Sequence, residues 1–351
     1  MQNPIPPTLT ELLEDSGVRL RLYDMGRRVR RISREELVRF EHAESSWPAP
    51  LLRQAWFGVL MESVASGDHQ IWFLRMPLDE QAKLVLPARD YFMQRLLEAW
   101  HHNRRQSDAS QLQDALKDNP CAFRPHAERL AVFHAKVSVD MHRQPSRFYA
   151  HAVDYFDGKP GWEQWNFVGY QGLADIAARH AEHAERIASS LAYLPLEQLS
   201  ALCHCLENEP VSPYIAAALA QQLRLRLQQR QPQPVAVAAL MRALSDSSAA
   251  GIRLASFEAV LGEQSLAGDI EILAAIAGRA WEMLRQPDFV GLYLQALASE
   301  AVGQQGFERL LEDLLFIPGV HQPLMEALKG AHRQSAVAKR FAHFRRSSAK
   351  G

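Results

Sequence analysis

The sequence has little cysteine, with three residues in a chain of 351. Cys203 and Cys205 fall inside an apolar helical pattern, so the cysteines form no disulfide framework and suit a reducing compartment. No apolar stretch approaches the roughly 18 residues that span a bilayer. The N-terminal Met-Gln-Asn-Pro-Ile-Pro-Pro also lacks the regions of a secretory signal. We therefore expect a cytoplasmic protein with no membrane partner.

An excess of charge of one sign is also missing. The chain carries 39 basic and 40 acidic residues, a net charge of -1, so no overall field attracts nucleic acid. Common catalytic motifs are absent as well: there is no P-loop, dinucleotide fingerprint, nucleophile elbow or His-Glu-x-x-His motif. The sequence favours a protein that is not an enzyme, and it indicates no cofactor.

The chain does have the length and composition of roughly two folded domains, with 47% hydrophobic and 23% charged residues. The turn Gly-Lys-Pro-Gly at 158–161 separates a part with strand patterns from a part without them. We therefore expect four segments. They are an α+β module over 1–157, a linker at 158–161, an all-α domain over 162–345 and a basic tail at 346–351.

Strand patterns in the first segment predict a small, mostly antiparallel sheet. Strict alternation or short apolar runs mark the strands, and a turn at Asp24-Met25-Gly26 joins the first two. The apolar run 52–62 fits either a strand or a helix. Capping-box spacing predicts helices that begin after Thr8 and after Ser33. The expected strands cover 18–23, 27–32, 71–74 and 132–141.

A repeated helical pattern follows residue 161. Apolar residues at i, i+3, i+4 and i+7 recur four times, and the starts lie 38, 36 and 34 residues apart by subtraction of their numbers. Helix pairs at such spacing indicate a HEAT-like α-solenoid, although a compact irregular helical domain is the alternative. The four stripes are Leu199, Leu202, Cys203 and Leu206; Val237, Leu240, Met241 and Leu244; Leu273, Ile276, Ala277 and Ala280; and Phe307, Leu310, Leu311 and Leu314.

Arginine is concentrated between Val18 and Arg34, where seven arginines accompany one acid, Asp24. A hairpin of arginines can hold an anion or a partner, and nucleic acid is one possible anion. The alternative is a solvated face that acidic residues of the next helix partly neutralise. The candidate anion- or partner-binding residues are Arg19, Arg21, Arg27, Arg28, Arg30 and Arg31.

The last 21 residues are also basic, with Phe341 and Phe344 between the charges. This pattern fits single-stranded nucleic acid, or a final amphipathic helix that caps the repeats.

Trp162, Trp165, Gly169 and Gly172 form a conspicuous group. Glycine weakens a helix by roughly 1 kcal/mol, so the glycines predict a close approach of another element. Tryptophan is enriched in binding hot spots. We assign the group to a domain interface or to a partner site.

Two groups of polar residues have side chains that could bind a metal or act as an acid or base. His180 and His183 share a helix face but lack further ligands, and Cys203 and Cys205 point apart on a helix, so we expect no metal site. Asp79 and Glu80 follow the strand 71–74, with His69 at its other end, and offer an acid or base. The alternative for the two acids is an ordinary helix start.

Three runs resemble a gammaproteobacterial family catalogued only as a domain of unknown function. The runs are Tyr-Asp-Met-Gly-Arg-Arg at 23–28, Ile-Trp-Phe-Leu-Arg-Met-Pro-Leu-Asp-Glu-Gln at 71–81 and Gln-Gly-Leu-Ala-Asp at 171–175. The resemblance covers nearly the whole chain. It implies a bacterial cytoplasmic setting and carries over no activity, cofactor or catalytic residue.

These patterns leave three hypotheses. The first is a non-enzymatic interaction or scaffold protein that binds an unidentified protein on its repeats. The second is a nucleic-acid or anion-binding protein that uses the arginine hairpin and the basic tail. The third is an enzyme of unknown class centred on Asp79 and Glu80.

Overall fold

The computed structural model describes residues 8–15, 17–64, 67–103, 119–332 and 335–348. The chain divides into two compact units, each with its own internal contacts. Unit 1 contains Met1–His126 with Phe316–Pro318, and unit 2 contains Ala127–Leu315 with Gly319–Gly351. The division after residue 126 differs from the expected boundary at 158–161.

Helix α5, Ala127–Asp140, accounts for this difference. We predicted a strand over 132–141 from alternating apolar residues, and that prediction was wrong. Phe133 and Val137 are buried four residues apart, as a helix requires, and α5 packs against α7 (Tyr170–Ala178). The preceding Ala-Glu-Arg-Leu-Ala contains strong helix formers, so the helix begins before the alternating stretch.

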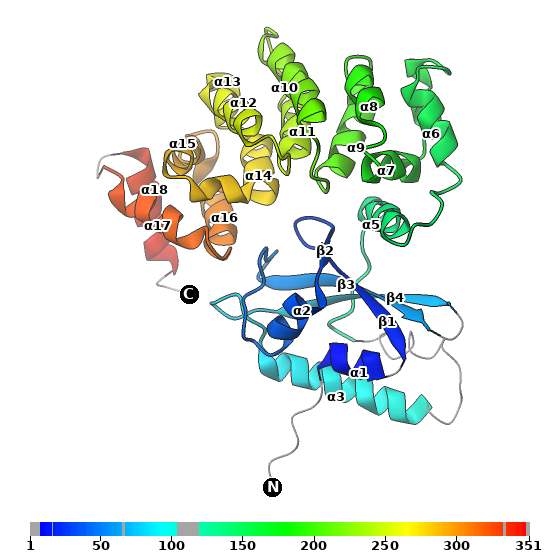
Figure 1. Cartoon of the computed structure of the whole chain (residues 1–351). Coiled ribbons are helices and arrows are strands. Elements are labelled where there is room, and N and C mark those ends of the chain that lie inside the picture. Colours follow the sequence, from blue (N-terminus) through cyan, green and yellow to red (C-terminus); the bar gives the residue numbers. More distant parts are fainter. Residues whose placement is uncertain (1–7, 16, 65–66, 104–118, 333–334, 349–351) are drawn as a thin grey trace. The chain divides into compact units, whose positions relative to one another are not determined.

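Unit 1 contains a four-stranded antiparallel sheet in the order β2-β1-β3-β4 (Figure 1). The sheet pairs Leu22 with both Ile32 and Val59, and Val59 with Trp72, so these four buried residues lie side by side. The ambiguous run 52–62 is therefore strand from residue 54. The strands are β1 Val18–Asp24, β2 Arg30–Ile32, β3 Gln54–Ser63 and β4 His69–Pro77.

Three helices pack on the sheet of unit 1: α1 (Leu9–Asp15), α2 (Arg34–Glu41) and α3 (Leu86–Asn103). Leu13, Phe40 and Phe92 of these helices form one hydrophobic core cluster with the buried sheet residues. Figure 1 shows α1 and α3 together on one side of the sheet.

The two predicted capping boxes of unit 1 are confirmed. Glu11 and Thr8 exchange hydrogen bonds at 3.1 and 3.2 Å, and Glu36 and Ser33 do so at 2.8 and 3.1 Å. Both α1 and α2 therefore begin where the sequence predicts.

All regular secondary structure in the described residues of unit 2 is helical, as predicted after residue 161. Most of its prolines lie at helix starts, including Pro213, which follows the N-cap Ser212. Besides α5 and α7, its helices are α6 Tyr149–Phe156, η1 Trp162–Phe167, α8 Ala184–Ser190, α9 Leu196–Leu206, α10 Pro213–Leu227, α11 Pro234–Leu244, α12 Ala250–Gly262, α13 Gln264–Ala267, α14 Ile270–Arg279, η2 Trp281–Arg285, α15 Pro287–Leu297, α16 Gly303–Leu315, α17 His321–Gly330 and α18 Ala336–Ser348.

The main helices of unit 2 pack in two successions (Figure 1). In the first, which we call row A, α7 contacts α9, α9 contacts α11, α11 contacts α14 and α14 contacts α16. In the second, row B, α8 contacts α10, α10 contacts α12, α12 contacts α15 and α15 contacts α17. The four apolar stripes lie on α9, α11, α14 with its C-cap Ala280, and α16, and all their residues are buried except the half-buried Leu310, so each stripe provides the buried face of one row A helix.

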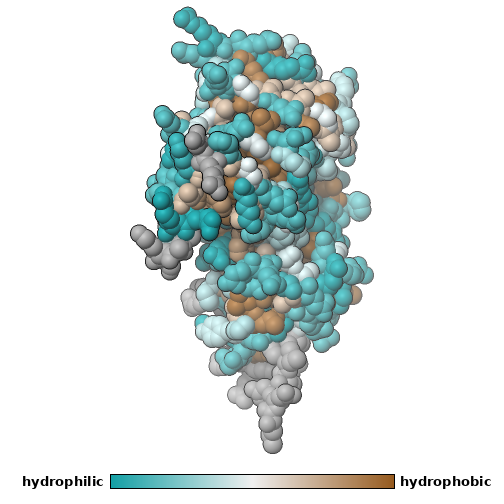
Figure 2. Space-filling view, turned by 90° about the vertical axis from the view of Figure 1, so that its left-hand side faces the viewer, coloured by the Kyte–Doolittle hydropathy of each residue, from teal (hydrophilic) through white to brown (hydrophobic). Residues whose placement is uncertain are grey.

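Within the described ranges, each helix is too short or too polar to cross a lipid bilayer. Figure 2 shows one face of the molecule, where hydrophobic residues interrupt a mostly hydrophilic surface in several places. Single exposed apolar residues are ordinary in folded proteins, so a binding site has to be identified from a groove or a pocket.

Candidate functional site

The six candidate arginines do not form one binding face. Arg21 pairs with Glu62 at 2.9 Å. Arg27 and Arg28 are only 1% and 4% exposed, and the Arg27 Nε donates to the carbonyl of Pro50 at 2.8 Å. The Arg31 guanidinium lies 5.8 Å from the ring centre of Tyr23. Arg19 and Arg30 are exposed.

The turn between β1 and β2 explains why Arg27 and Arg28 are buried. We expected the second strand over 27–32, but β2 begins at Arg30. The Asp24 carboxylate accepts the backbone N–H of Gly26 at 2.7 Å, so the chain bends directly after β1. Residues 27–29 then lie in a buried loop instead of a strand.

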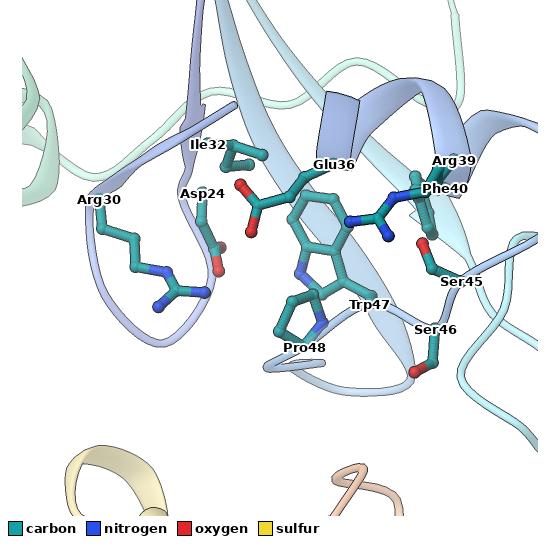
Figure 3. Close-up of a pocket in the computed structure, with 10 residues that line it drawn as sticks. All are labelled: Asp24, Arg30, Ile32, Glu36, Arg39, Phe40, Ser45, Ser46, Trp47 and Pro48. Carbon is teal, nitrogen blue, oxygen red and sulfur yellow. The ribbon is translucent and has the colours of Figure 1, made fainter. Parts of the chain in front are cut away.

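One of the six arginines, Arg30, lines a pocket of unit 1 that we call the Trp47 pocket (Figure 3). Its volume is about 120 Å³. Residues of β1, β2, α2 and the loop after α2 form its walls. They are Asp24, Arg30, Ile32, Glu36, Arg39, Phe40, Ser45, Ser46, Trp47 and Pro48.

The floor of this pocket is aromatic and rigidly held. The rings of Phe40 and Trp47 meet edge to face with their centres 4.8 Å apart, and both residues are 2% exposed. The backbone N–H of Trp47 donates to the carbonyl of Ala82 at 2.7 Å, which fixes the loop after α2. The pocket therefore has a defined shape.

Sequence reasoning missed Arg39, Ser45, Ser46 and Trp47 as pocket residues. The run Ser-Ser-Trp-Pro at 45–48 was a possible signal, because it places a large aromatic side chain in an otherwise polar stretch. Nothing in the sequence indicated that this loop lies beside Arg30, since β1, β2 and α2 have to fold before these residues meet.

Asp79, Glu80 and His69 are not assembled into a catalytic group. Asp79 accepts the backbone N–H groups of Gln81 and Lys83, both at 2.9 Å, and so shapes a turn. The predicted helix start at this point was wrong, because α3 begins only at Leu86. The length of β4 separates His69 from Asp79 by about 30 Å at 3.3 Å per residue.

The tryptophan and glycine group packs inside unit 2. The ring of Trp162 stacks on that of Tyr193 with centres 5.4 Å apart, and the carbonyl of Trp165 accepts from Gln198 at 2.9 Å. A Cβ atom on Gly169 would lie 3.5 Å from the Phe148 ring, and one on Gly172 only 2.8 Å from the Phe148 carbonyl. The close approach predicted from the glycines therefore occurs within unit 2.

His183 uses both ring nitrogens within the protein. The Tyr149 hydroxyl lies 2.5 Å from Nε2, and Arg186 lies 2.7 Å from Nδ1. Because arginine only donates, Nδ1 accepts and the neutral ring carries its proton on Nε2, which donates to Tyr149. Burial, together with the charge of Arg186, lowers the pKa of His183. Among the described residues, no three His, Cys, Asp or Glu side chains gather as metal ligands.

A second cavity lies in unit 2 between α10 and α12, both of row B, and we call it the α10–α12 groove. Its volume is about 440 Å³. Leu223 is buried at its base, whereas Ala255 and Ala259 are small and exposed. Arg224 is the single charged residue among the nine that line it. They are Ala220, Leu223, Arg224, Leu227, Gly251, Ile252, Ala255, Ser256 and Ala259.

The C-terminal basic residues belong to helix α18, which packs on α15, α16 and α17. Val337 and Phe341 are buried, and Arg340 donates to the carbonyl of Ser299 at 3.3 Å. The helix continues to Ser348, past the expected start of a tail at residue 346. Arg333 and Lys350 lie outside the described residues.

The comparison with known families agrees with the resemblance seen in the sequence. Residues 6–344 match the family described as "Protein of unknown function (DUF3549)". The chain belongs to this family. The match extends through both units of the fold, so a member of the DUF3549 family combines the sheet with the helical rows. No curated protein and no solved structure matches the chain.

Proposed function

We propose that the chain is a non-enzymatic interaction protein and that unit 2, a HEAT-like α-solenoid, binds its partner. The two rows support the solenoid, because each helix packs on the next helix of its own row. The repeat spacing of 38, 36 and 34 residues supports it as well. Stacked repeats present long continuous surfaces, which suit binding to another protein.

The α10–α12 groove is the observation that carries this proposal. Row B leaves an open apolar cavity of about 440 Å³ between two adjacent helices. Ala255 and Ala259 on its rim are small, so the backbone of a bound helix can approach closely. Grooves of this kind bind the apolar face of an amphipathic segment.

Charge complementarity defines the partner further. The nine residues that line the groove include no acid, and the last turn of α10 carries Arg224 and Arg226. Arg224 lies on the groove itself. The partner segment is therefore an amphipathic helix with aliphatic side chains for the groove and a carboxylate for Arg224.

Site-specific crosslinking in the native host tests the proposal. A photoreactive residue at Ala255 should give a crosslinked protein, and mass spectrometry should place the link in an acidic amphipathic segment. The same residue at Ala342, an exposed position on α18, is the matched control. Arg224→Glu should remove the product at 255. Identical products at both positions, or none at 255, would contradict the proposal.

The cellular setting is part of the same proposal. We expect the protein to act in a bacterial cytoplasm, where thiols stay reduced. In support, Cys121, Cys203 and Cys205 are all buried and unpaired.

A further inference from the structure

We propose that the Trp47 pocket binds a small monocarboxylate with a short hydrocarbon part. This site is in unit 1 and is independent of the partner surface proposed above. The arrangement of its donors, its charge balance and its apolar wall together carry the inference (Figure 3).

The positive groups of the pocket are unengaged. The guanidinium groups of Arg30 and Arg39 make no hydrogen bond or ion pair with any residue in the described part of the chain, and both side chains are exposed. In Figure 3, Arg30 and Arg39 lie on opposite sides of the Trp47 indole. A guanidinium presents donors that match a carboxylate, so an anion within the pocket can be held from either side.

The indole N–H of Trp47 is a further donor without a partner. It is buried, and it has no acceptor among the described residues. A buried donor left unpaired costs about 1–3 kcal/mol, so its persistence in a native fold needs a reason. Figure 3 shows the indole nitrogen on the edge of the ring nearer to Arg30.

The acidic groups of the pocket are already engaged by backbone donors. Asp24 accepts from Gly26 at 2.7 Å, and one oxygen of Glu36 accepts from Ser33 at 2.8 Å. The four charged lining residues, Asp24, Glu36, Arg30 and Arg39, sum to zero. One ligand carboxylate can pair with the arginines, whereas each further negative charge on the ligand adds repulsion from Asp24 and Glu36.

Size and polarity restrict the rest of the ligand. A volume of about 120 Å³ corresponds to about four water molecules at 30 Å³ each. Ile32, Phe40 and the face of Trp47 form an apolar wall. A ligand of about six non-hydrogen atoms, with a carboxylate at one end and a few methylene groups at the other, fits both limits.

Nuclear magnetic resonance of the full chain tests this proposal. The sequence contains seven tryptophans, and the peak that disappears in Trp47→Phe assigns the indole N–H of Trp47. Titration with butyrate should shift this peak saturably. Inorganic phosphate and butylammonium should leave it in place. A saturable shift with phosphate, or none with butyrate, would overturn the proposal.

Charge variants distinguish specific binding of butyrate in the pocket from nonspecific attraction of an anion to basic residues. Arg30→Gln and Arg39→Gln should each weaken butyrate binding about tenfold or more, as expected for loss of a charged hydrogen bond. Arg19→Gln removes an exposed arginine from the same sheet, outside the pocket, and should bind as the wild type does. Unchanged peak patterns elsewhere would show that each variant is folded. Equal weakening by all three variants would refute a specific site.

Discussion

The hydroxyl of Thr10 donates a hydrogen bond to the buried carboxylate of Glu41 at 2.6 Å. The same carboxylate accepts the backbone N–H of Leu9 at 2.8 Å. Residues at the end of α2 thereby satisfy donors in the first turn of α1, which a helix cannot satisfy internally. Burial raises the pKa of Glu41, although the bonds from Thr10 and Leu9 oppose this rise.

Glu41→Gln is expected to destabilise unit 1 by about 1–3 kcal/mol, because the amide cannot accept at both oxygen positions. The folded state binds the Glu41 proton more tightly than the unfolded state does. The wild-type free energy of unfolding should therefore fall as pH rises above 4.5, the ordinary pKa. Urea denaturation at several pH values measures this. If the difference in free energy of unfolding between wild type and variant widens as pH rises, the raised pKa of Glu41 is contradicted.

Gly172→Ala is expected to destabilise unit 2 by about 1–3 kcal/mol through overpacking. The new Cβ would lie 2.8 Å from the Phe148 carbonyl and 3.0 Å from the Ala152 side chain. Gly291→Ala, within α15, is the matched control, because no atom beyond its chain neighbours and the local backbone of its own helix lies within 4 Å of its Cβ position. The control should stabilise by about 0.5–1 kcal/mol. Thermal unfolding would show both effects. Equal shifts of the unfolding midpoint temperature in the two variants would argue against the close contact at Gly172.

Lys136→Met is expected to cost about 3–5 kcal/mol, because it leaves a buried carboxylate without its partner. The Lys136 Nζ lies 2.7 Å from Glu209, and the two side chains are 14% and 8% exposed. Adding Glu209→Leu should recover much of the loss, since the unpaired charge is then gone. Chemical denaturation of both variants distinguishes the outcomes. A double variant less stable than the single variant would disprove the explanation.

The thiols of Cys203 and Cys205 are expected to resist modification in the native protein. Both are buried within α9, and burial raises the pKa of each. Little reactive thiolate therefore forms at neutral pH. Ellman's reagent should react with them only after a denaturant is added. Rapid native reaction would show that α9 opens readily.

Local signals in the sequence identified several elements correctly. The reciprocal hydrogen bonds of Ser33 and Glu36 depend on residues three apart, so their pattern is visible in the chain itself. The same holds for Ser212 before Pro213. Apolar spacing also located the buried faces of α9, α11, α14 and α16, because burial in a helix follows a fixed period.

Features that depend on distant contacts were not predictable. The apolar residues from Phe133 to Met141 are compatible with the period of a strand and with that of a helix. Only the packing of α5 on α7 decides between the two. The arginine pattern could not show that Arg27 is buried, since its acceptor at Pro50 is 23 residues away. Trp47 and Arg30 meet only when α2 and β2 are in place, so no spacing rule indicates their pocket.

The two rows of unit 2 have a consequence for how the chain acquires its structure. Helices that follow one another in the chain, such as α6 and α7 or α10 and α11, contact each other, whereas β1 of unit 1 must pair Val18 with Ser63, 45 residues further along the chain by subtraction. Contacts between residues close in sequence close a short loop, which costs little entropy and forms quickly. Contacts between distant residues close a long loop and form slowly. We expect unit 2 to order progressively during synthesis on the ribosome, and pulsed hydrogen exchange during refolding should detect protection in α9 and α11 before β1.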